Sequence, residues 1–597
     1  MTQTFSKWLL WCCSIVLVIT FMILQQLPLS IGDASLNSPQ KSTITFPYSF
    51  KSKANQVYQY NVQINYSLFS SSHLKIVPDD CLEYLSVNDT VVPVKSIKGR
   101  CNWQKGFSID LKPYLKEGKN TLHLHVKNKD GIGGLNLIAT QDYDSLTYYL
   151  ISSLMIFSLI VLLFLTLSYS GLSLELILLL LAGILLRLAY LSYTDFDART
   201  FDVVLHSGHL DYIKMIANEF RLPNPTQGWE YHQPPLYYAL GAIFYKFADL
   251  TGVVNKYTLL QLFSLSTFII FLFYSIKTLA LVIPHRWMLF FATMLLVFWP
   301  SGIIHSIRLG NDVLFYALFA ISFYYMLLWQ RNEKALWITV LFASLALITK
   351  ANGIILFGII GILLLIQLIQ TRSFRSILRP LTLVIVFFAI AFTINFADNI
   401  YYALQGNGED WLVSNVVNTI NHKLFVSNSF DNYVYFDLKT YLKEPYIDAW
   451  NDQYGRQYFW NYLFKSSLFS EFFFKTPIQI LLASLISLLS LSIFVYIGLA
   501  IATLSKAELL EAKPFLLVIF LSLAALLAYR IKIPVACNTD FRYIFPILIA
   551  MGYFYSLALH KIQKNGYVIL EWFGYLQVTL FSIFTILFFT ITTLSNI

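Results

Sequence analysis

Charged residues are scarce in this chain. Only 13% of its 597 residues are charged, whereas 57% are hydrophobic and 17% are aromatic. Soluble domains average about a quarter charged residues. The composition therefore excludes an ordinary soluble protein, and it predicts that lipid is the main solvent of the chain.

Several motifs are also missing. The net charge is +9, but the basic residues are scattered between apolar runs and form no aromatic-interleaved patch, which argues against a nucleic-acid partner. No Gly-rich loop follows a strand and opens a helix, so nucleotide binding of the Rossmann kind is unsupported. The sequence shows neither an internal repeat nor a tight metal-ligand spacing.

Cysteine is rare, with five residues in the whole chain. Cys12 and Cys13 lie in the first apolar run, and Cys537 lies near the C-terminal end. Cys81 and Cys101 share the one large polar stretch. This pair suits a disulfide, provided that the stretch faces an oxidising compartment.

Long apolar runs dominate what is present. With their flanks they approach or exceed the roughly 20 residues that cross a bilayer core, and about thirteen such segments are expected. Clear examples are residues 151–167, 336–348, 354–369, 381–396, 478–499 and 578–594. The predicted fold class is a mainly α, polytopic membrane protein with about 13 transmembrane helices and a small extracytoplasmic β-sandwich near the N-terminus.

Three regions follow along the chain. Residues 1–30 are expected to be an uncleaved membrane anchor, because no small-residue cleavage site precedes Asp33. Residues 35–145 alternate apolar and polar side chains with a period of two, which predicts the β-sandwich. Its stretch 110–122 locally resembles jelly-roll sugar-binding modules. The sandwich can therefore bind a sugar or the acceptor, or it can have a structural or docking role. Residues 147–597 form the transmembrane domain, with external loops at 195–256 and 399–476.

Orientation follows from the basic residues, which stay preferentially on the cytoplasmic side. The run 371–379 is the firmest cytoplasmic anchor, and runs 330–334, 506–513 and 561–564 agree with it. The sandwich and residues 195–256, 303–312, 399–476 and 530–543 then share the opposite face. Arg530 and Lys532 count against this assignment. Residues 235–249 are expected to form an interfacial helix, which puts Asp312 on the same side as Asp202.

The first external loop of the transmembrane domain carries the densest group of polar residues. Asp195, Asp197 and Asp202 follow a membrane span directly, and histidines and further acids come after them. Polar groups of this density at a bilayer surface indicate a functional site.

The order of the later motifs resembles the GT-C superfamily of polyprenol-phosphate-dependent glycosyltransferases, which includes protein mannosyltransferases and aminoarabinose transferases. After the acidic loop come His-Gln-Pro-Pro-Leu-Tyr-Tyr at 232–238, Gly-Asn-Asp at 310–312, Thr-Lys-Ala-Asn-Gly at 349–353 and Asn-Thr-Asp-Phe-Arg-Tyr-Ile-Phe-Pro at 538–546. Together they cover residues 175–560. Each motif is weak alone, and their order carries the resemblance.

The resemblance implies an inverting transfer from a polyprenyl-phosphate-linked sugar to a lipid, glycan or protein acceptor. The expected place is the extracytoplasmic face of a bacterial plasma membrane, among membrane lipids. An inverting enzyme needs one carboxylate to take the acceptor proton. Asp202 is the first choice for this base, with Asp195 and Asp197 as alternatives. The stretch 202–209 is longer than the compact acidic pair common in the superfamily, and any of these acids can instead solvate the loop or pair with Arg199.

The leaving phosphate carries negative charge and needs cations. Arg542 is the expected phosphate clamp, because a guanidinium fork holds two phosphate oxygens and keeps its charge. Its neighbour Tyr543 belongs to the same motif, and Lys350 and Arg308 are second choices. Arg542 can alternatively pair with Asp540 or anchor its span at the headgroups.

Further ligands are expected near the double proline. The resemblance makes Glu230 and His232 candidates for the donor site or a metal, and Tyr212 a candidate for substrate binding. His206, His209 and Asp312 can complete a set of oxygen and nitrogen ligands for a divalent metal ion, the one cofactor expected. A histidine at an interface also serves simply as a hydrogen-bonding residue.

Two other functions fit the same pattern. A transporter or flippase of lipid-linked saccharides also has many spans and a polar cluster, but transporters usually show repeats and mid-bilayer charges. A ligase that moves a whole glycan from a pyrophosphate carrier differs only in its donor.

Overall fold

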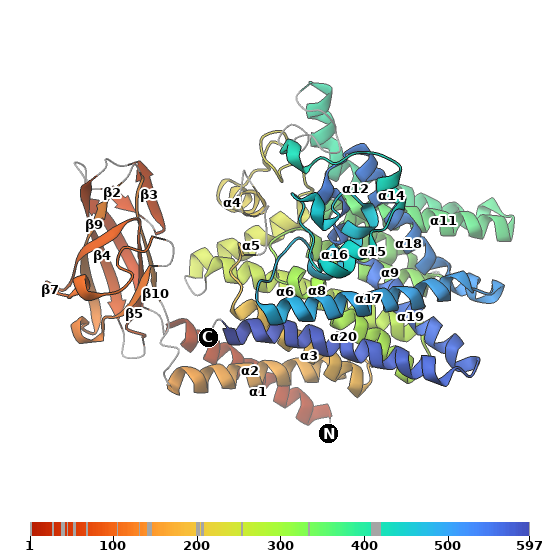
Figure 1. The fold of residues 1–597 in the computed structure, drawn as a ribbon, viewed down its shortest axis with the longest axis horizontal. Helices are drawn as coiled ribbons and strands as arrows, with labels where there is room; N and C mark the ends of the chain where they lie inside the picture. The colour runs from red at the N-terminus through yellow and green to blue at the C-terminus, as the bar shows by residue number, and fades with distance from the viewer. Residues whose placement is uncertain are drawn as a thin grey trace. The chain divides into compact units, whose positions relative to one another are not determined.

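The computed structural model describes residues 3–26, 29–37, 42–44, 46–51, 55–66, 70–103, 106–129, 132–139, 146–198, 203, 208–251, 255–331, 335–406 and 420–595. The chain divides into two compact units, Met1–Ser170 and Gly171–Ile597. Figure 1 colours the first unit from red to orange and the second from orange to blue.

Among its described residues, the first unit combines two apolar helices with ten strands. Helices α1 (Gln3–Gln26) and α2 (Leu146–Ser168) pack against each other. The strands are β1 (Ser30–Asn37), β2 (Ser42–Ile44), β3 (Tyr48–Lys51), β4 (Gln56–Tyr66), β5 (His73–Pro78), β6 (Cys81–Val87), β7 (Thr90–Val91), β8 (Phe107–Asp110), β9 (Gly118–Asn128) and β10 (Ile132–Ala139).

These strands form two antiparallel sheets around one hydrophobic cluster. The six-stranded sheet has the order β2-β1-β4-β9-β6-β7, and the four-stranded sheet has the order β3-β10-β5-β8. Alternation drives the arrangement, because every second side chain of a strand points to the same face. Leu122 and Leu124 of β9 are buried in the cluster together with Leu74 and Ile76 of β5. The period of two in the sequence thus corresponds to strands.

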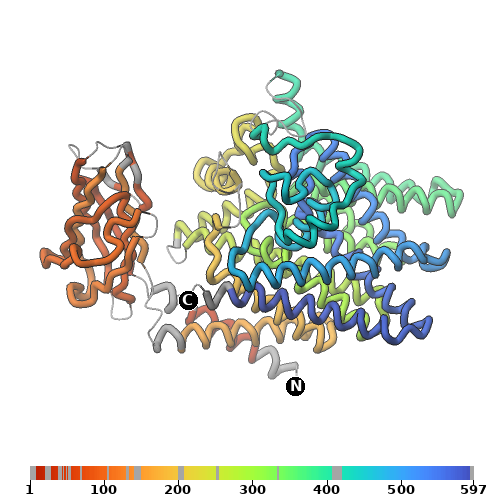
Figure 2. The backbone as a smooth tube through the Cα atoms, in the orientation of Figure 1, coloured from red at the N-terminus to blue at the C-terminus, as the bar shows by residue number. Residues whose placement is uncertain are grey.

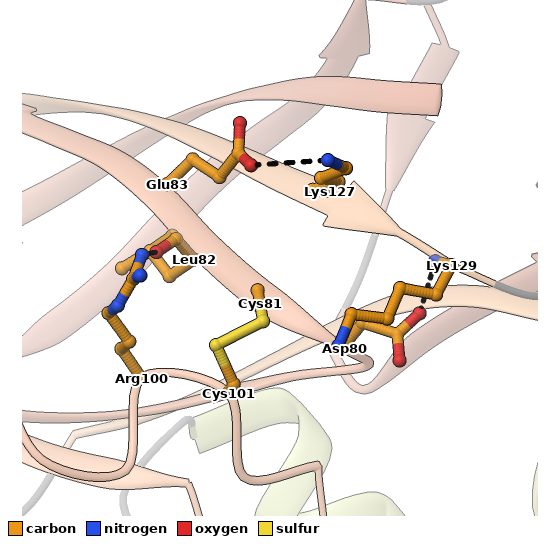
Figure 3. Close-up of a disulfide and its surroundings, with 8 residues drawn as sticks. All are labelled: Asp80, Cys81, Leu82, Glu83, Arg100, Cys101, Lys127 and Lys129. Carbon is orange, nitrogen blue, oxygen red and sulfur yellow. Dashed lines mark hydrogen bonds and ion pairs between the residues drawn. A yellow bond between two sulfur atoms is a disulfide. The ribbon is translucent and has the colours of Figure 1, made fainter. Parts of the chain in front are cut away.

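A disulfide joins Cys81, at the start of β6, to Cys101, and so confirms the predicted pair (Figure 3). Two backbone-linked contacts lie beside it. The amide of Leu82 donates to the carbonyl of Arg100 at 2.9 Å, and the Arg100 guanidinium donates back to the carbonyl of Leu82 at 3.3 Å. The disulfide therefore ties β6 to the loop before β8.

The second unit is helical. Its helices are α3 (Leu174–Ser192), α4 (His209–Glu219), α5 (Leu236–Thr251), α6 (Lys256–Val282), α7 (Arg286–Val297), α8 (Pro300–His305), α9 (Asp312–Trp329), α10 (Leu336–Thr349), α11 (Ile354–Thr371), α12 (Phe374–Leu404), α14 (Asp431–Val434), α15 (Leu438–Lys443), α16 (Phe459–Phe469), α17 (Pro477–Ala502), α18 (Lys506–Lys532), α19 (Ile547–Lys564) and α20 (Val568–Ser595). Three short 3-10 helices matter for the site: η4 (Ala351–Gly353), η7 (Ala536–Thr539) and η8 (Phe541–Ile544).

Across both units, nine helices of the described residues are long and apolar enough to cross a membrane. The number is ten if the bent pair of residues 536–544 and helix α19 counts as one span. The chain is thus an integral membrane protein. Three further apolar helices within 9–20, 286–297 and 336–349 are shorter, so the total of about thirteen spans stays a prediction.

The long helices pack side by side in the second unit. Helix α9 packs on α6 and α10, and α17 packs on α19 and α20. Figure 1 shows α17, α20 and α3 running alongside one another. The teal segment that contains α14, α15 and α16 forms a group of short turns beside α17 in Figure 2, and α16 also contacts α8, η7 and η8. This segment therefore reaches the ends of several spans.

Helix ends are fixed by local polar contacts. Ser505 and Glu508 form a capping box at the start of α18, where each side chain bonds the other residue's backbone amide. Lys561 of α19 lies 3.0 Å from Glu508. At the other end of α18, Arg530 is buried and donates to the carbonyls of Val535 and Gln457. Arg530 thus folds the turn into η7, which explains a basic residue on the face assigned as external.

Candidate functional site

The centre of the site is a buried ion pair between the ends of helices α9 and α10. Asp312 begins α9, and Lys350 follows the last residue of α10. The Lys350 ammonium donates to the Asp312 carboxylate, and the two side chains are 7% and 12% exposed. A guanidinium nitrogen of Arg542 lies 4.0 Å from the other Asp312 oxygen. Three residues predicted to bind substrate or metal thus lie together.

The Tyr543 ring lies against both cations, Lys350 and Arg542. Its ring lies 5.0 Å from the Lys350 ammonium and 5.1 Å from the Arg542 guanidinium. Arg542 also donates to the Tyr543 hydroxyl at 3.3 Å. Such cation–π contacts favour a positive charge over an aromatic face. Asn352 of η4 donates to the Tyr543 carbonyl at 2.7 Å, so the two 3-10 helices are held against each other.

Helix η8 is positioned by contacts on both sides of Arg542. Asp540 caps η8 by accepting from the Arg542 amide at 3.1 Å, and its second oxygen lies 3.6 Å from the Arg542 guanidinium. Tyr316 of α9 donates to the Arg542 carbonyl at 2.7 Å. Arg542 therefore pairs with Asp540, which the sequence analysis gave as an alternative to phosphate binding. It also faces Asp312.

Glu471 is an acid of this site that the sequence analysis did not single out. Glu471 follows α16, and its carboxyl group accepts a hydrogen bond from the Tyr462 hydroxyl. It also interacts electrostatically with Asp540, Arg542 and Arg308. Burial, followed by repulsion from Asp540, raises the pKa of Glu471 to about 7. The sequence carried one signal, since Glu471 is the only acid in the aromatic run 464–474.

Arg308 and His305 lie at the edge of the same cluster. Arg308 lies 3.5 Å from the His305 imidazole and 5.8 Å from the ring of Phe472. His305 is buried in α8. Burial, followed by the field of Arg308, lowers the pKa of His305. His305, which the sequence did not indicate, is thus a neutral neighbour of the cations.

Only two of the three acids proposed as the base lie among the described residues. Asp202 and His206 lie outside the described residues. Asp195 and Asp197 are exposed, and the carbonyl of Asp195 closes a turn by accepting from the amide of Ala198 at 3.1 Å. Within the described ranges, neither carboxylate makes a hydrogen bond or ion pair with the cationic cluster. The choice of base stays a prediction.

A second polar group surrounds His209, the first residue of α4. The His209 imidazole lies 2.8 Å from the Tyr238 hydroxyl and 3.9 Å from the Glu230 carboxylate. Tyr212 stacks on Tyr238 at 3.9 Å. The structure thus brings the predicted His209, Glu230 and Tyr212 together around Tyr238.

Hydrogen bonds connect this group to the ion pair. Gln233 accepts from Asn311 at 3.0 Å, and Asn311 also donates to the carbonyl of Thr349 at 3.1 Å. The His232 carbonyl accepts from Asn399 at 3.2 Å. Burial, followed by repulsion from His209 and Lys350, lowers the pKa of His232 to about 4, so its imidazole is neutral near pH 7.

The predicted metal ligands are only partly described, because His206 lies outside the described residues. Within the part of the chain that the structure describes, no three His, Cys, Asp or Glu side chains come together as a metal site. Asp312 is occupied by Lys350 and faces Arg542. A divalent metal ion at this place stays a prediction.

A cavity of about 260 Å³ opens beside Lys350 and Tyr543. Phe392 and Phe396 of α12, together with Leu526 of α18, give it apolar walls. Its polar lining includes His232, Gln233, Lys350, Asn352, Asn395, Asn399 and Lys532. The cavity thus combines apolar side chains from two spans with the cations Lys350 and Lys532.

The solved structures that resemble this chain include two of ArnT. The sequence matches no protein-family model and no curated protein. ArnT from Cupriavidus metallidurans bound to undecaprenyl phosphate is 13% identical over 70% of this chain and 76% of its own, with a TM-score of 0.33. Apo ArnT is 14% identical over the same shares, with a TM-score of 0.34. ArnT belongs to the aminoarabinose transferases that the motifs resemble, but likenesses this low carry no argument about the reaction.

Proposed function

We propose that this protein is a membrane glycosyltransferase that moves a sugar from a polyprenyl-phosphate carrier to an extracytoplasmic lipid, glycan or protein acceptor. One observation carries the proposal. A cavity lined by apolar side chains of α12 and α18 is also lined by Lys350 and Tyr543, and the Arg542 guanidinium lies 5.1 Å from the Tyr543 ring. A polyprenyl phosphate has the same polarity, because an apolar chain ends in a phosphate.

The cations suit the departing phosphate. In an inverting transfer, the C1–O bond to the phosphate breaks and the electron pair stays on the phosphate oxygen. Arg542 presents a fork of donors, and Lys350 supplies a compact positive charge. Tyr316 and Asp540 hold the backbone of η8, so the fork is preorganised where negative charge develops.

The acceptor proton needs a base, and a carboxylate of the loop 195–202 fills this role in the proposal. Asp202 remains the first choice, with Asp195 and Asp197 as alternatives. The basic run 371–379 supports a reaction face on the extracytoplasmic side, in a bacterial plasma membrane. Segments that the sequence assigns to this face lie close together. Asp312 faces Arg542, and the Ser470 hydroxyl donates to Asp540 at 3.3 Å.

The cavity can be tested by filling it. Ile355 lines it and is buried, so Ile355→Trp should weaken binding of a polyprenyl phosphate at least tenfold. Ile369, on the same helix, is 66% exposed, and Ile369→Trp serves as the matched control. Equal binding by both variants would refute the cavity as the carrier site.

The reaction is tested separately. Mass spectrometry of membrane glycolipids and glycoproteins, with and without the gene, should reveal one missing sugar. In a purified assay with that donor, Asp202→Asn should abolish transfer while carrier binding persists. A normal rate would move the role of base to Asp195 or Asp197.

A further inference from the structure

A further cavity, of about 390 Å³, lies between one end of α9, one end of α11 and one end of α18. Its lining includes Trp329, the last residue of α9, Gln370 in the last turn of α11, and Lys513 in the second turn of α18. Asp312 is at the other end of α9, which has 18 residues. A helix of this length rises about 27 Å, close to the roughly 30 Å of a bilayer core. The cavity therefore lies at the membrane face opposite to the ion pair of Asp312 and Lys350.

The lining of this cavity is polar and positively charged. Arg331 and Lys513 contribute two cations, and Gln330, Gln367 and Gln370 contribute three amide groups. Among the described residues that line it, none is Asp or Glu. The cavity thus offers positive charge and neutral hydrogen-bonding groups, which suit a ligand with one negative charge and several polar atoms.

Both cations can bind a further group. Arg331 is exposed and donates one N–H to the carbonyl of Leu281 at 3.4 Å, and a guanidinium has five such donors. Lys513 makes neither a hydrogen bond nor an ion pair within the described part of the chain. The acids of the same helix do not neutralise Lys513. Glu508 pairs with Lys561 at 3.0 Å, and Glu511, two positions before Lys513, lies about 200° around the helix.

Exposed aliphatic side chains surround one side of the cavity. Leu510 lines it and is 59% exposed. On α11, Leu365 and Ile369 lie beside the lining residues and are 54% and 66% exposed. Exposed apolar side chains of membrane-spanning helices contact acyl chains, because lipid is their solvent. A lipid can therefore place its headgroup in the cavity while its acyl chains remain in the bilayer.

We propose that this cavity binds the headgroup of an anionic phospholipid that carries hydroxyl groups, as phosphatidylglycerol does. Arg331 and Lys513 bind the phosphodiester oxygens, and the amides of Gln367 and Gln370 bind the hydroxyl groups. Basic pockets between spans on the cytoplasmic side bind anionic headgroups, and the runs 330–334 and 506–513 are predicted to be cytoplasmic. Phosphatidylethanolamine fits less well, because its ammonium group would face two cations.

The test is lipid binding to the purified full-length protein in detergent, titrated by native mass spectrometry with phosphatidylglycerol. Arg331→Gln combined with Lys513→Gln should raise the dissociation constant at least about tenfold. The matched control combines Arg372→Gln with Lys506→Gln, which removes the same charge from two exposed residues outside the cavity lining. This control should bind like the wild-type protein. Equal losses in both double variants would overturn the site, because the attraction would then come from surface charge alone.

A second variant tests the role of the amides. Phosphatidylmethanol has the same single charge as phosphatidylglycerol but no hydroxyl group. Gln367→Leu should therefore weaken binding of phosphatidylglycerol at least about threefold and leave binding of phosphatidylmethanol unchanged. Equal weakening of both lipids would overturn hydroxyl recognition by Gln367.

A soluble phosphate is the other source of the same chemistry. Glycerol phosphate carries the phosphate and the hydroxyl groups without acyl chains, and it should bind at least about a hundredfold more weakly than phosphatidylglycerol, because burial of acyl chains adds to the affinity. Equal affinities for the two would overturn the assignment to a lipid. Binding of phosphatidylethanolamine as tight as that of phosphatidylglycerol would overturn the preference for an anionic headgroup.

Discussion

Removing the Lys350 ammonium isolates the energetics of the buried ion pair. Lys350→Met keeps a long side chain but leaves the Asp312 carboxylate without its closest cation. The two side chains are 7% and 12% exposed, so water cannot replace the lost partner. Breaking a buried pair in this way costs about 3–5 kcal/mol of unfolding free energy.

The structure places the expected cost at the lower end of that range. Arg542 lies 4.0 Å from the second Asp312 oxygen and continues to compensate part of the charge. We therefore expect Lys350→Met to cost about 3 kcal/mol. Asp312→Asn in the same background removes the uncompensated charge, so the double variant should recover at least about 2 kcal/mol of that loss.

Denaturant unfolding of the purified protein in detergent micelles measures these values. The matched control is Lys256→Met, because Lys256 and Asp249 form a pair at 3.2 Å with side chains 34% and 39% exposed. That exposed pair is worth about 0–1 kcal/mol. Equal losses in Lys350→Met and Lys256→Met, or additive losses in the double variant, would refute the argument from burial.

Three further predictions concern stability. Cys81→Ser opens the disulfide to Cys101 across a separation of 20 residues, and loop entropy of this size corresponds to about 3 kcal/mol; faster limited proteolysis of the first unit would show the loss. The pKa of His232 is lowered from 6.5 to about 4, so the unfolded chain gains a proton before the folded protein does as the pH falls below 6.5. The free energy of unfolding should therefore be unaffected by His232 above pH 6.5 and should decrease as the pH drops toward 4. His232→Asn should flatten this part of a stability–pH curve. Arg530→Gln weakens hydrogen bonds to two carbonyls and should cost about 2 kcal/mol in denaturant unfolding, whereas exposed Lys532→Gln should cost less than about 0.5 kcal/mol.

Part of the site was accessible from the sequence. Lys350 and Arg542 lie in short polar motifs between apolar runs, where an ionisable residue indicates function. The motifs did not show that Lys350 bonds Asp312 or that Tyr316 bonds the carbonyl of Arg542. Those contacts join residues far apart in the chain, and apolar periodicity says nothing about which helix ends meet. Glu471 was missed because Asp540, Arg542 and Arg308 come from other segments, and the sequence does not show that these segments meet.

By itself, the sequence predicted a membrane protein, strands among the described residues of 35–145, and Cys101 as the partner of Cys81 in an oxidising compartment. These features depend on local composition and on side-chain period, which are properties of contiguous segments. Only the tertiary structure decided which charges are paired and which carboxyl groups are buried among them. Burial and electrostatic fields are summed over several elements, and they exist only once α9, α10, α16 and η8 have packed together.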